Sequence, residues 1–478
     1  MAGLLAFSLA CSPSFAEGLP NLGDASAADL SPQVERRLGE SIMRDIRLRE
    51  PTYLDDPELE AYANELGYRL AVNADTVGGD FRFFVINDTA INAFAMFGGF
   101  VGLNTGLILA AQTESELAGV LAHEISHVSQ RHLARQMAKE KQVALAGVLS
   151  IALALVAARS NTDVIGATLM ASQAASIQSQ LAFSRDFERE ADRAGFDLLE
   201  KAGFDVYGMV QFFERLQRAS RLYENGAPVY MRSHPVTTER LSDMESRVNK
   251  LPYRQVPSSV DFHLVRAKLT AALGTAQEAI SEAERLLREH KHASLIAARY
   301  TLALALQRDR QFAAAEAALA SAISGGESAA MLERLAAELR GQQGDWAGAI
   351  KRYESALQRF PSAPALRYGY ADALLAAGEH EKARRFLVDA LQQYATDPRL
   401  YSVLAQVYQA MGRLASQHRA QAELYMLNGA LSAAIEQLQF AQRVKSVDFY
   451  EQSALEARLR EFKALQAEEA KRAKSQSQ

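Results

Sequence analysis

The residues of this chain best suited to chemistry are two histidines and a glutamate, His123, Glu124 and His127, spaced as H-E-x-x-H. Residues four apart lie one turn above each other on a helix, so both imidazoles can reach one zinc ion. The glutamate between them is placed to take a proton from a water whose pKa the metal lowers. The spacing therefore predicts a metal-dependent hydrolase.

The residues around this motif predict a helix. Thr113 and Glu116 fit a capping box at its start. Apolar residues then recur at helical spacing, namely Leu117, Val120, Leu121, Ile125 and Val128. Residues 120–141 contain no glycine or proline, so the helical pattern continues past the motif. On such a helix His132 lies about 140° around from His127, which predicts a surface residue and not a ligand.

Two histidines leave a zinc ion in need of a third protein ligand. Residues 184–201 begin with a serine suited to an N-cap and carry several carboxylates. Glu188 and Asp192 share a helix face, so one could bind the metal while the other holds a ligand histidine by its second nitrogen. Asp186 and Glu190 are also four apart, so spacing alone does not choose between the two pairs.

Patterns upstream of the motif predict a small sheet beside the metal-binding helix. Residues 29–71 are helical in pattern, whereas residues 81–87 are dense in aromatic and β-branched side chains and predict a strand. Residues 91–109 contain turn-forming glycines and predict a second strand or a hairpin. An exposed edge strand at this place can pair with the extended backbone of a substrate.

An apolar run follows the motif at residues 143–158, interrupted only by Gly147 and Ser150. As a helix it spans about 24 Å, short of the roughly 30 Å of a bilayer core. A second helical pattern continues to residue 183. We interpret residues 143–183 as a helical hairpin that shields the cleft or dips into a membrane surface. An ordinary buried core hairpin is the alternative.

The whole chain has 478 residues, which indicates two or three domains. A net charge of −5 argues against nucleic acid as a partner. Residues 1–16 are largely apolar and end in small residues that fit a signal-peptidase site, although no Lys or Arg precedes Arg36. We predict cleavage after Ala16 and export to the periplasm. The mature chain would then lack cysteine, because Cys11 is the single one.

Four further segments follow the predicted signal peptide. Residues 17–250 are predicted to form the protease domain and residues 251–261 a linker. Within residues 262–465, glycines recur at an interval of 34, typical of tetratricopeptide repeats, at Gly344, Gly378 and Gly412. Such a solenoid presents a concave face to a protein or peptide; a helical stack that merely supports the protease domain is the alternative. Residues 466–478 are a polar tail expected to fray.

The motifs together resemble a known group of metalloproteases. The H-E-I-S-H motif, with E-R-E-A-D about sixty residues later at 188–192, resembles the gluzincins of the HtpX and CAAX-processing type. The N-A-F-A stretch at 92–95 and the glycine pair at 98–99 match as well. Phe97 departs from the pattern, since these relatives tend to have proline there.

The resemblance assigns roles to the residues of the motifs. It implies that zinc is bound by His123, His127 and Glu188. It also implies that Glu124 is the general base and that Asp192 is a supporting carboxylate of the site.

The resemblance extends to S-H-P at residues 233–235, followed by Arg240. In the family this histidine can occupy the fourth zinc position and hold the enzyme latent, while the arginine sits by the cleft. His234 is therefore a candidate ligand and Arg240 a candidate catalytic-site residue. Without the resemblance, a lone histidine before proline is usually an ordinary loop residue.

Taken over its whole length, the chain is similar to the β-barrel assembly-enhancing proteases of the bacterial periplasm. This implies an α+β fold, mostly α, with a zincin-type protease domain followed by an α-solenoid of tetratricopeptide repeats. It implies a periplasmic zinc metalloendopeptidase with chaperone-like activity, whose substrates are misassembled or stalled outer-membrane β-barrel proteins and whose repeats dock the barrel-assembly machinery or the client. A non-proteolytic repeat scaffold or chaperone is the alternative, but a scaffold has no physical need of H-E-x-x-H with Glu188.

Overall fold

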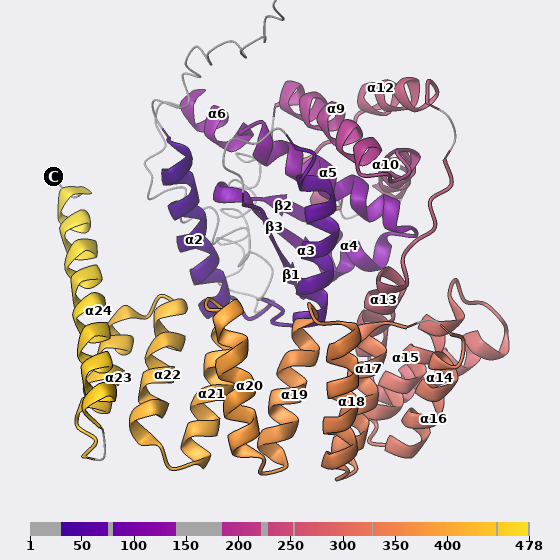
Figure 1. Ribbon diagram of the computed structural model, residues 1–478. Coiled ribbons are helices and arrows are strands. Elements are labelled where there is room, and N and C mark those ends of the chain that lie inside the picture. Colours follow the sequence, from indigo (N-terminus) through magenta and orange to yellow (C-terminus); the bar gives the residue numbers. More distant parts are fainter. Residues whose placement is uncertain are drawn as a thin grey trace, which may run out of the picture.

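The structure is a computed structural model that describes residues 30–74, 80–139, 184–220, 228–251, 254–326, 328–445 and 448–476. The predicted signal peptide and the predicted apolar hairpin at 143–183 lie outside the described residues. The described elements form an upper body that holds the sheet and a lower row of upright helices (Figure 1). The predicted class, α+β with mostly helices, is confirmed.

In the part of the chain that the structure describes, the sheet of the upper body has three strands in the order β1-β3-β2. Strand β1 (Arg82–Ile86) pairs parallel with β3 (Phe100–Asn104), and β2 (Ala93–Ala95) pairs antiparallel with β3. A short 3-10 turn joins β2 to β3, and Gly98 and Gly99 within it have φ values of 73° and 84°. Such values favour glycine, so the glycine pair builds the hairpin. The predicted small sheet is confirmed.

The predicted strand region does not extend to residue 109, because helix α4 (Thr105–Ala110) begins directly after β3. The hydroxyl of Thr105 donates to the carbonyl of Asp88 at 3.0 Å. A Cβ on Gly106 would lie 2.1 Å from the carbonyl oxygen of Thr89. This glycine therefore serves a close backbone contact and not a turn.

Helix α5 (Glu114–Ser129) carries the H-E-x-x-H motif through the centre of the upper body. Thr113 caps it as predicted and accepts the N–H of Glu116 at 3.2 Å. Glu116 does not complete the capping box with Thr113; it accepts instead from the backbone of Gln112. Every residue from 114 to 127 is buried, so polar groups on this helix need partners inside the protein.

Seven further helices of the upper body lie within the described residues. They are α2 (Pro32–Arg49), α3 (Pro57–Ala71), α6 (His132–Lys139), α9 (Arg185–Lys201), α10 (Tyr207–Ser220), α11 (Val229–Ser233) and α12 (Thr238–Val248). In Figure 1, α9, α10 and α12 lie on the same side of α5.

The predicted continuation of the motif helix past residue 129 is wrong. Helix α5 ends at Ser129, and Arg131 adopts a φ of 53° before α6 begins at His132. The guanidinium of Arg131 donates to the carbonyl of Leu30 at 2.6 Å and to Glu35 at 2.9 Å. These contacts come from a distant segment and stabilise the turn at Arg131. The break in the helix therefore cannot be predicted from the neighbouring residues alone.

The lower row consists of paired helices, as predicted for tetratricopeptide repeats. The helices are α13 (Val260–Ala272), α14 (Ala276–Arg288), α15 (Leu295–Arg308), α16 (Phe312–Ile323), α17 (Ala330–Gln342), α18 (Trp346–Arg359), α19 (Pro364–Ala376), α20 (His380–Gln393), α21 (Pro398–Ala410), α22 (Leu414–Leu427), α23 (Leu431–Gln442) and α24 (Phe449–Gln476). Helix α13 begins inside the predicted linker, and α24 continues through most of the predicted tail.

The 34-residue interval marks the end of the first helix in each pair. The glycines at these points have positive φ values, 86° at Gly344, 78° at Gly378 and 70° at Gly412. Glycine in this conformation commonly ends a helix. Arg310, one interval earlier, adopts the same conformation with a φ of 61°. The repeat register therefore persists where the glycine is missing.

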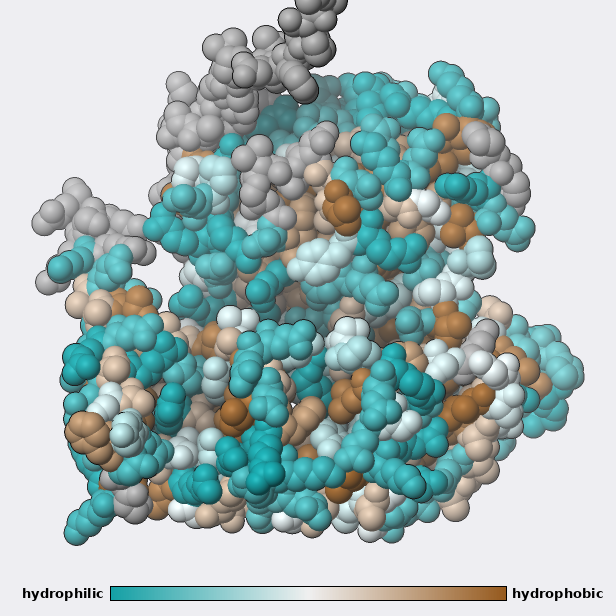
Figure 2. All heavy atoms as spheres, in the orientation of Figure 1, coloured by the Kyte–Doolittle hydropathy of each residue, from teal (hydrophilic) through white to brown (hydrophobic). Residues whose placement is uncertain are grey.

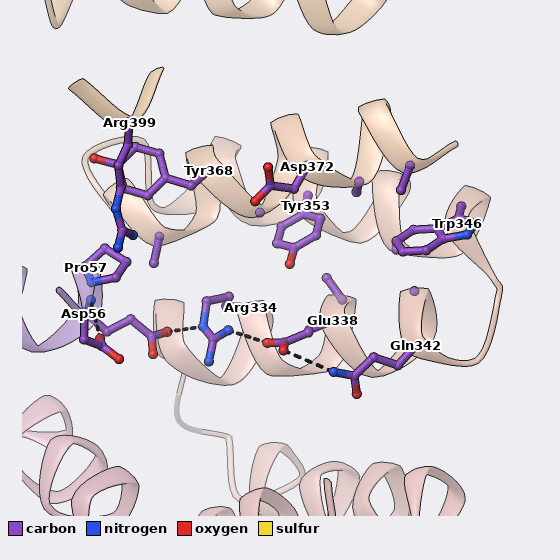
Figure 3. A pocket seen from close by; sticks show the side chains of 18 of the residues that line it. Asp56, Pro57, Arg334, Glu338, Gln342, Trp346, Tyr353, Tyr368, Asp372 and Arg399 are labelled. Atoms are coloured by element: carbon purple, nitrogen blue, oxygen red, sulfur yellow. Dashed lines mark hydrogen bonds and ion pairs between the residues drawn. The ribbon is translucent and has the colours of Figure 1, made fainter. Parts of the chain in front are cut away.

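The lower row closes against the N-terminal end of α3 through a buried carboxylate. Glu58 is 7% exposed and lies 2.6 Å from the Nε of Arg334 on α17 and 2.5 Å from the Nζ of Lys268 on α13. A cavity of about 550 Å³ adjoins these groups. Figure 3 shows Asp56 and Pro57 at one end of this cavity and Trp346 at the other.

The surface visible in Figure 2 mixes hydrophilic and hydrophobic residues, with no single large apolar area on that face. None of the described helices combines the length and the hydropathy that a membrane span requires.

The buried position of Glu58 leads to a stability prediction. Replacing it by alanine removes the carboxylate that Arg334 and Lys268 share, while Glu338 and Asp56 still contact these cations. We expect Glu58→Ala to lower the free energy of unfolding by about 3 kcal/mol, measured by chemical denaturation. Asp55→Ala is the control, because Asp55 is 63% exposed in its ion pair with Arg399 and should matter by less than about 1 kcal/mol. Equal losses would contradict the prediction.

Candidate metal centre

Four residues from three segments converge in the upper body. His123 and His127 come from α5, Glu188 from the first turn of α9, and His234 from the residue that follows α11. One possible ligand atom from each lies within 4.8 Å of the others. The Nε2 atoms of His123 and His127 are 3.0 Å apart. All four side chains are almost fully buried.

From the sequence alone, either of two carboxylate pairs on α9 could face the histidines. The structure shows which pair does. Glu188 and Asp192 are buried and point toward α5. Asp186 is 85% exposed and pairs with Arg189 on the surface. The face of α9 that carries Glu188 and Asp192 is therefore the face that meets the histidines.

The donor set fits a metal ion. Glu188 Oε1 lies 3.4 Å from His127 Nε2 and 3.0 Å from His234 Nδ1, so nitrogen and oxygen donors face a common centre. Imidazole and carboxylate groups in such a set are typical metal ligands. Neither carboxylate oxygen of Glu124 has a hydrogen-bond partner within the described part of the chain, although both are buried. A buried carboxylate in that state costs free energy unless a cation or a bound molecule compensates it.

Asp192, held by Arg240, contacts the cluster on the side of His123 that faces away from the other three residues. Asp192 Oδ1 lies 3.0 Å from the Nδ1 of His123, the nitrogen that points away from the cluster. Arg240 donates two hydrogen bonds of 2.7 Å to the Asp192 carboxylate. A third nitrogen of Arg240 lies 2.7 Å from Glu188 and also donates to the carbonyl of Pro235. Arg240 therefore ties α9 to the loop that carries His234.

The charged groups shift one another's protonation. Burial lowers the pKa of His123, but hydrogen bonds with Asp192 and Glu188 outweigh it and raise the pKa to about 9. Burial dominates at His127 and lowers its pKa well below the ordinary value. Burial raises the pKa of Glu188, yet the charge of His234 and hydrogen bonds from the other histidines hold it well below its ordinary value. Glu188 is therefore ionised at neutral pH, as a metal ligand must be.

His132 belongs to this site, and its prediction as a surface residue is wrong. It is 0% exposed, and its Nδ1 lies 2.9 Å from the Nδ1 of His127. Its ring stacks on Phe187, with 4.5 Å between ring centroids. Burial lowers the pKa of His132 to about 4, so the ring is neutral at pH 7. The turn at Arg131 brings His132 under His127, which a continuous helix would not do.

Tyr230 is a second residue that the sequence did not point to. Its ring stacks on His234 with a centroid distance of 4.7 Å and packs on Phe213 behind it. The residue is fully buried, and within the described ranges its hydroxyl has no hydrogen-bond partner. No spacing rule connects Tyr230 to the H-E-x-x-H motif, so only the folded chain reveals it.

Comparison with known proteins identifies the family. Residues 57–248 match the family model of peptidase family M48, and residues 342–415 match a tetratricopeptide repeat model. The chain is 32% identical to the β-barrel assembly-enhancing protease of Yersinia pestis, over 94% of this chain and 92% of that protein. It is 31% identical to the Escherichia coli (strain K12) protein of the same name, over 95% and 93%. The chain belongs to the β-barrel assembly-enhancing protease family.

Membership of this family makes the chain a metalloendopeptidase of family M48 with tetratricopeptide repeats. A putative β-barrel assembly-enhancing protease of Vibrio cholerae is 40% identical over a shorter stretch, 55% of this chain and 54% of that protein. The M48 match contains all seven predicted site residues.

The cluster geometry predicts which carboxylate holds the metal. Glu188→Gln removes the charge of this candidate ligand while keeping the side-chain shape. We expect the affinity for zinc to fall by more than about 100-fold, since even changes to groups that only support a ligand cost 10–100-fold. Competition with a chromophoric chelator measures this. Glu200→Gln is the control on the exposed side of α9, and an equal effect of both substitutions would contradict the assignment.

Proposed function

We propose that this metalloendopeptidase uses zinc, works in the bacterial periplasm and cleaves misassembled or stalled outer-membrane β-barrel proteins. One observation carries the catalytic part. His123, His127 and Glu188 converge on a common centre beside Glu124, whose carboxylate oxygens have no hydrogen-bond partner within the described residues.

Zinc is the proposed metal because two histidines and a carboxylate are its usual protein ligands in hydrolytic sites. An ion held there would supply a Lewis acid that polarises the scissile carbonyl and lowers the pKa of the attacking water. His123 and His127 would hold it by their Nε2 atoms, which face each other. Asp192 would keep the ring of His123 in place through Nδ1.

Glu124 is the proposed general base. It takes one proton from the attacking water as the water oxygen bonds to the carbonyl carbon. It then gives that proton to the nitrogen of the leaving amine as the peptide bond breaks. The buried surroundings of Glu124 exclude bulk water, which favours transfer between the carboxylate and the reacting groups.

The outer edge of β2, which pairs with no other strand among the described residues, is the proposed docking site for the substrate backbone. Met96 N–H donates to Phe100 and Asn104 N–H donates to Asn92, which fixes the hydrogen-bonded pairs between β2 and β3. By alternation, the backbone groups of Ala93 and Ala95 point away from β3. An extended peptide can pair with these groups as an added strand.

The names of the relatives and the predicted signal peptide support the proposed substrate class and compartment. The relatives are named for enhancing β-barrel assembly, and a cleavable leader at residues 1–16 would deliver the chain to the periplasm. The repeats of the lower row would bind the barrel-assembly machinery or the client on their concave face. They also support the second candidate, in which chaperone or scaffold activity is the main role.

Glu124→Gln tests the catalytic proposal. The substitution removes the base but keeps a side chain of the same shape, so zinc should still bind. We expect cleavage of an unfolded outer-membrane protein to fall by at least about 100-fold, since a positioned acid–base group contributes 10²–10⁴-fold. Zinc content is measured in the same preparation. Retained turnover with full zinc would refute the role of Glu124.

The same variant separates the enzyme from the scaffold. If Glu124→Gln restores outer-membrane assembly in cells that lack the protein, while a variant without residues 262–465 does not, the scaffold is the main function. The reverse result supports proteolysis.

We further propose that His234 keeps the enzyme latent. Its Nδ1 lies 3.0 Å from the ligand Glu188, and its Nε2 lies 3.5 Å from the base Glu124. A ring in this position would offer a fourth donor to a bound metal ion, and it lies beside the base. A substrate must displace it before water and the scissile bond can enter.

His234→Ala should therefore raise basal cleavage. If His234 blocks the site in about nine-tenths of the molecules, removing its ring should raise the rate of basal cleavage by about 10-fold. Cleavage of an unstructured peptide at saturating zinc measures the change. His292→Ala, in the repeat region, is the matched control. Unchanged or lower activity of His234→Ala would show that this histidine does not restrain the enzyme.

A further inference from the structure

The first residue of α6, His132, touches the back of the ligand His127. The Nδ1 atoms of the two rings are 2.9 Å apart. On the other side of His132, Nε2 lies 3.3 Å from Glu190 Oε2, and Arg135 donates to both oxygens of Glu190 at 3.0 and 3.1 Å. The contacts form a chain from the ligand to the surface.

The protons of this chain can be assigned from the geometry. His127 Nε2 faces His123 and Glu188, so this nitrogen is the one available to a metal. A neutral ring that binds through Nε2 carries its proton on Nδ1. That proton points at His132 Nδ1, which must then accept it and carry its own proton on Nε2. The proton on Nε2 then lies on the side of Glu190, whose Oε2 is 3.3 Å away, so the acidic side chain faces the protonated nitrogen.

The second ligand histidine has an equivalent support. His123 Nδ1 faces Asp192, and Arg240 holds Asp192 in place. His127 Nδ1 faces His132, which Glu190 and Arg135 hold in turn. Glu190 and Asp192 both belong to α9, which also supplies the ligand Glu188. One helix therefore provides a ligand and part of the support for both ligand histidines.

We propose that His132 is a positioning residue that fixes the tautomer and the ring orientation of His127 for metal binding. This inference rests on the proposed metal site and names a residue to which the H-E-x-x-H motif assigns no role. The stacking of His132 on Phe187 and the turn at Arg131 keep the acceptor nitrogen in place. Partners that orient a metal-binding histidine in this way usually change metal affinity when they are removed.

Two substitutions of equal size test the proposal. Asn and Leu have nearly the same shape, but the Asn carbonyl can accept a hydrogen bond close to the position of the histidine Nδ1. His132→Leu leaves the N–H of His127 without this acceptor and should lower the zinc affinity 10–100-fold. His132→Asn should stay close to the wild-type affinity. Competition with a chromophoric chelator gives the affinities.

The visible spectrum of the cobalt(II)-substituted full-length protein is the second measurement. A His127 ring that has lost its orientation should alter the cobalt absorption bands in His132→Leu and not in His132→Asn. Thermal unfolding without metal checks that both variants fold. If His132→Leu binds zinc as the wild type does and has the same cobalt spectrum, His132 serves packing alone and the proposal is overturned.

An equal loss of affinity in both variants also overturns the proposal, because the ring itself would then matter and not its acceptor nitrogen. A wild-type protein that fails to bind zinc at all would overturn the proposed metal site, and this inference with it. The two failures are therefore distinguishable.

Discussion

The close approach of α5 and α9 is the constraint on which the site depends. A Cβ on Gly195 would lie 3.2 Å from the backbone nitrogen of His123, closer than side chains normally pack. Glycine at this point therefore lets the two helices cross nearly backbone to backbone. Gly195 follows Glu188 by two helical turns and Asp192 by one, so all three lie on one face. A longer distance between the helices would move both carboxylates away from the histidines.

Charge balance explains why such a cluster can exist in the interior. Glu124, Glu188 and Asp192 bring three carboxylates into it, and Arg240 brings one positive charge. A divalent cation that displaces the proton retained by His123, whose pKa is raised to about 9, would bring the sum to zero. Since burying uncompensated charge is costly, the arginine and the metal together account for three acidic side chains in a space that excludes water. The same argument explains why Arg240 contacts two of the three.

The sequence predicted the parts of the site that depend on local periodicity. His123, Glu124 and His127 follow from one helical turn, and the pairing of Glu188 with Asp192 follows from another. Spacing could not separate that pair from Asp186 and Glu190, because which face of α9 meets α5 is decided by packing. The structure places Glu188 and Asp192 inward, where both face His123; the roles that the resemblance assigns to them stay predictions.

The position of His132 could not be predicted from its neighbours in the sequence. The prediction that it lies on the surface assumed a helix unbroken past Ser129. The break depends on Arg131, whose side chain is held by Glu35 and the carbonyl of Leu30, roughly a hundred residues earlier in the chain. Contacts of that kind have no counterpart in a sequence window. The small sheet, in contrast, was predictable because strand patterns and glycine turns are local features.

The repeats form hydrogen bonds with the upper body at α5, the helix that also carries His123 and His127. Glu114, the first residue of α5, accepts hydrogen bonds from the backbone and the hydroxyl of Ser259, at 3.0 and 2.7 Å. Ser259 in turn caps α13 by accepting from Phe262 N–H at 3.1 Å. Together with Glu58, this gives the lower row two buried carboxylate anchors on the upper body. Swinging the repeats away would therefore break the hydrogen bonds and ion pairs of both anchors. These contacts hold the repeats at a fixed position relative to α5. A client bound by the repeats, as proposed above, would therefore meet the protease in a fixed orientation.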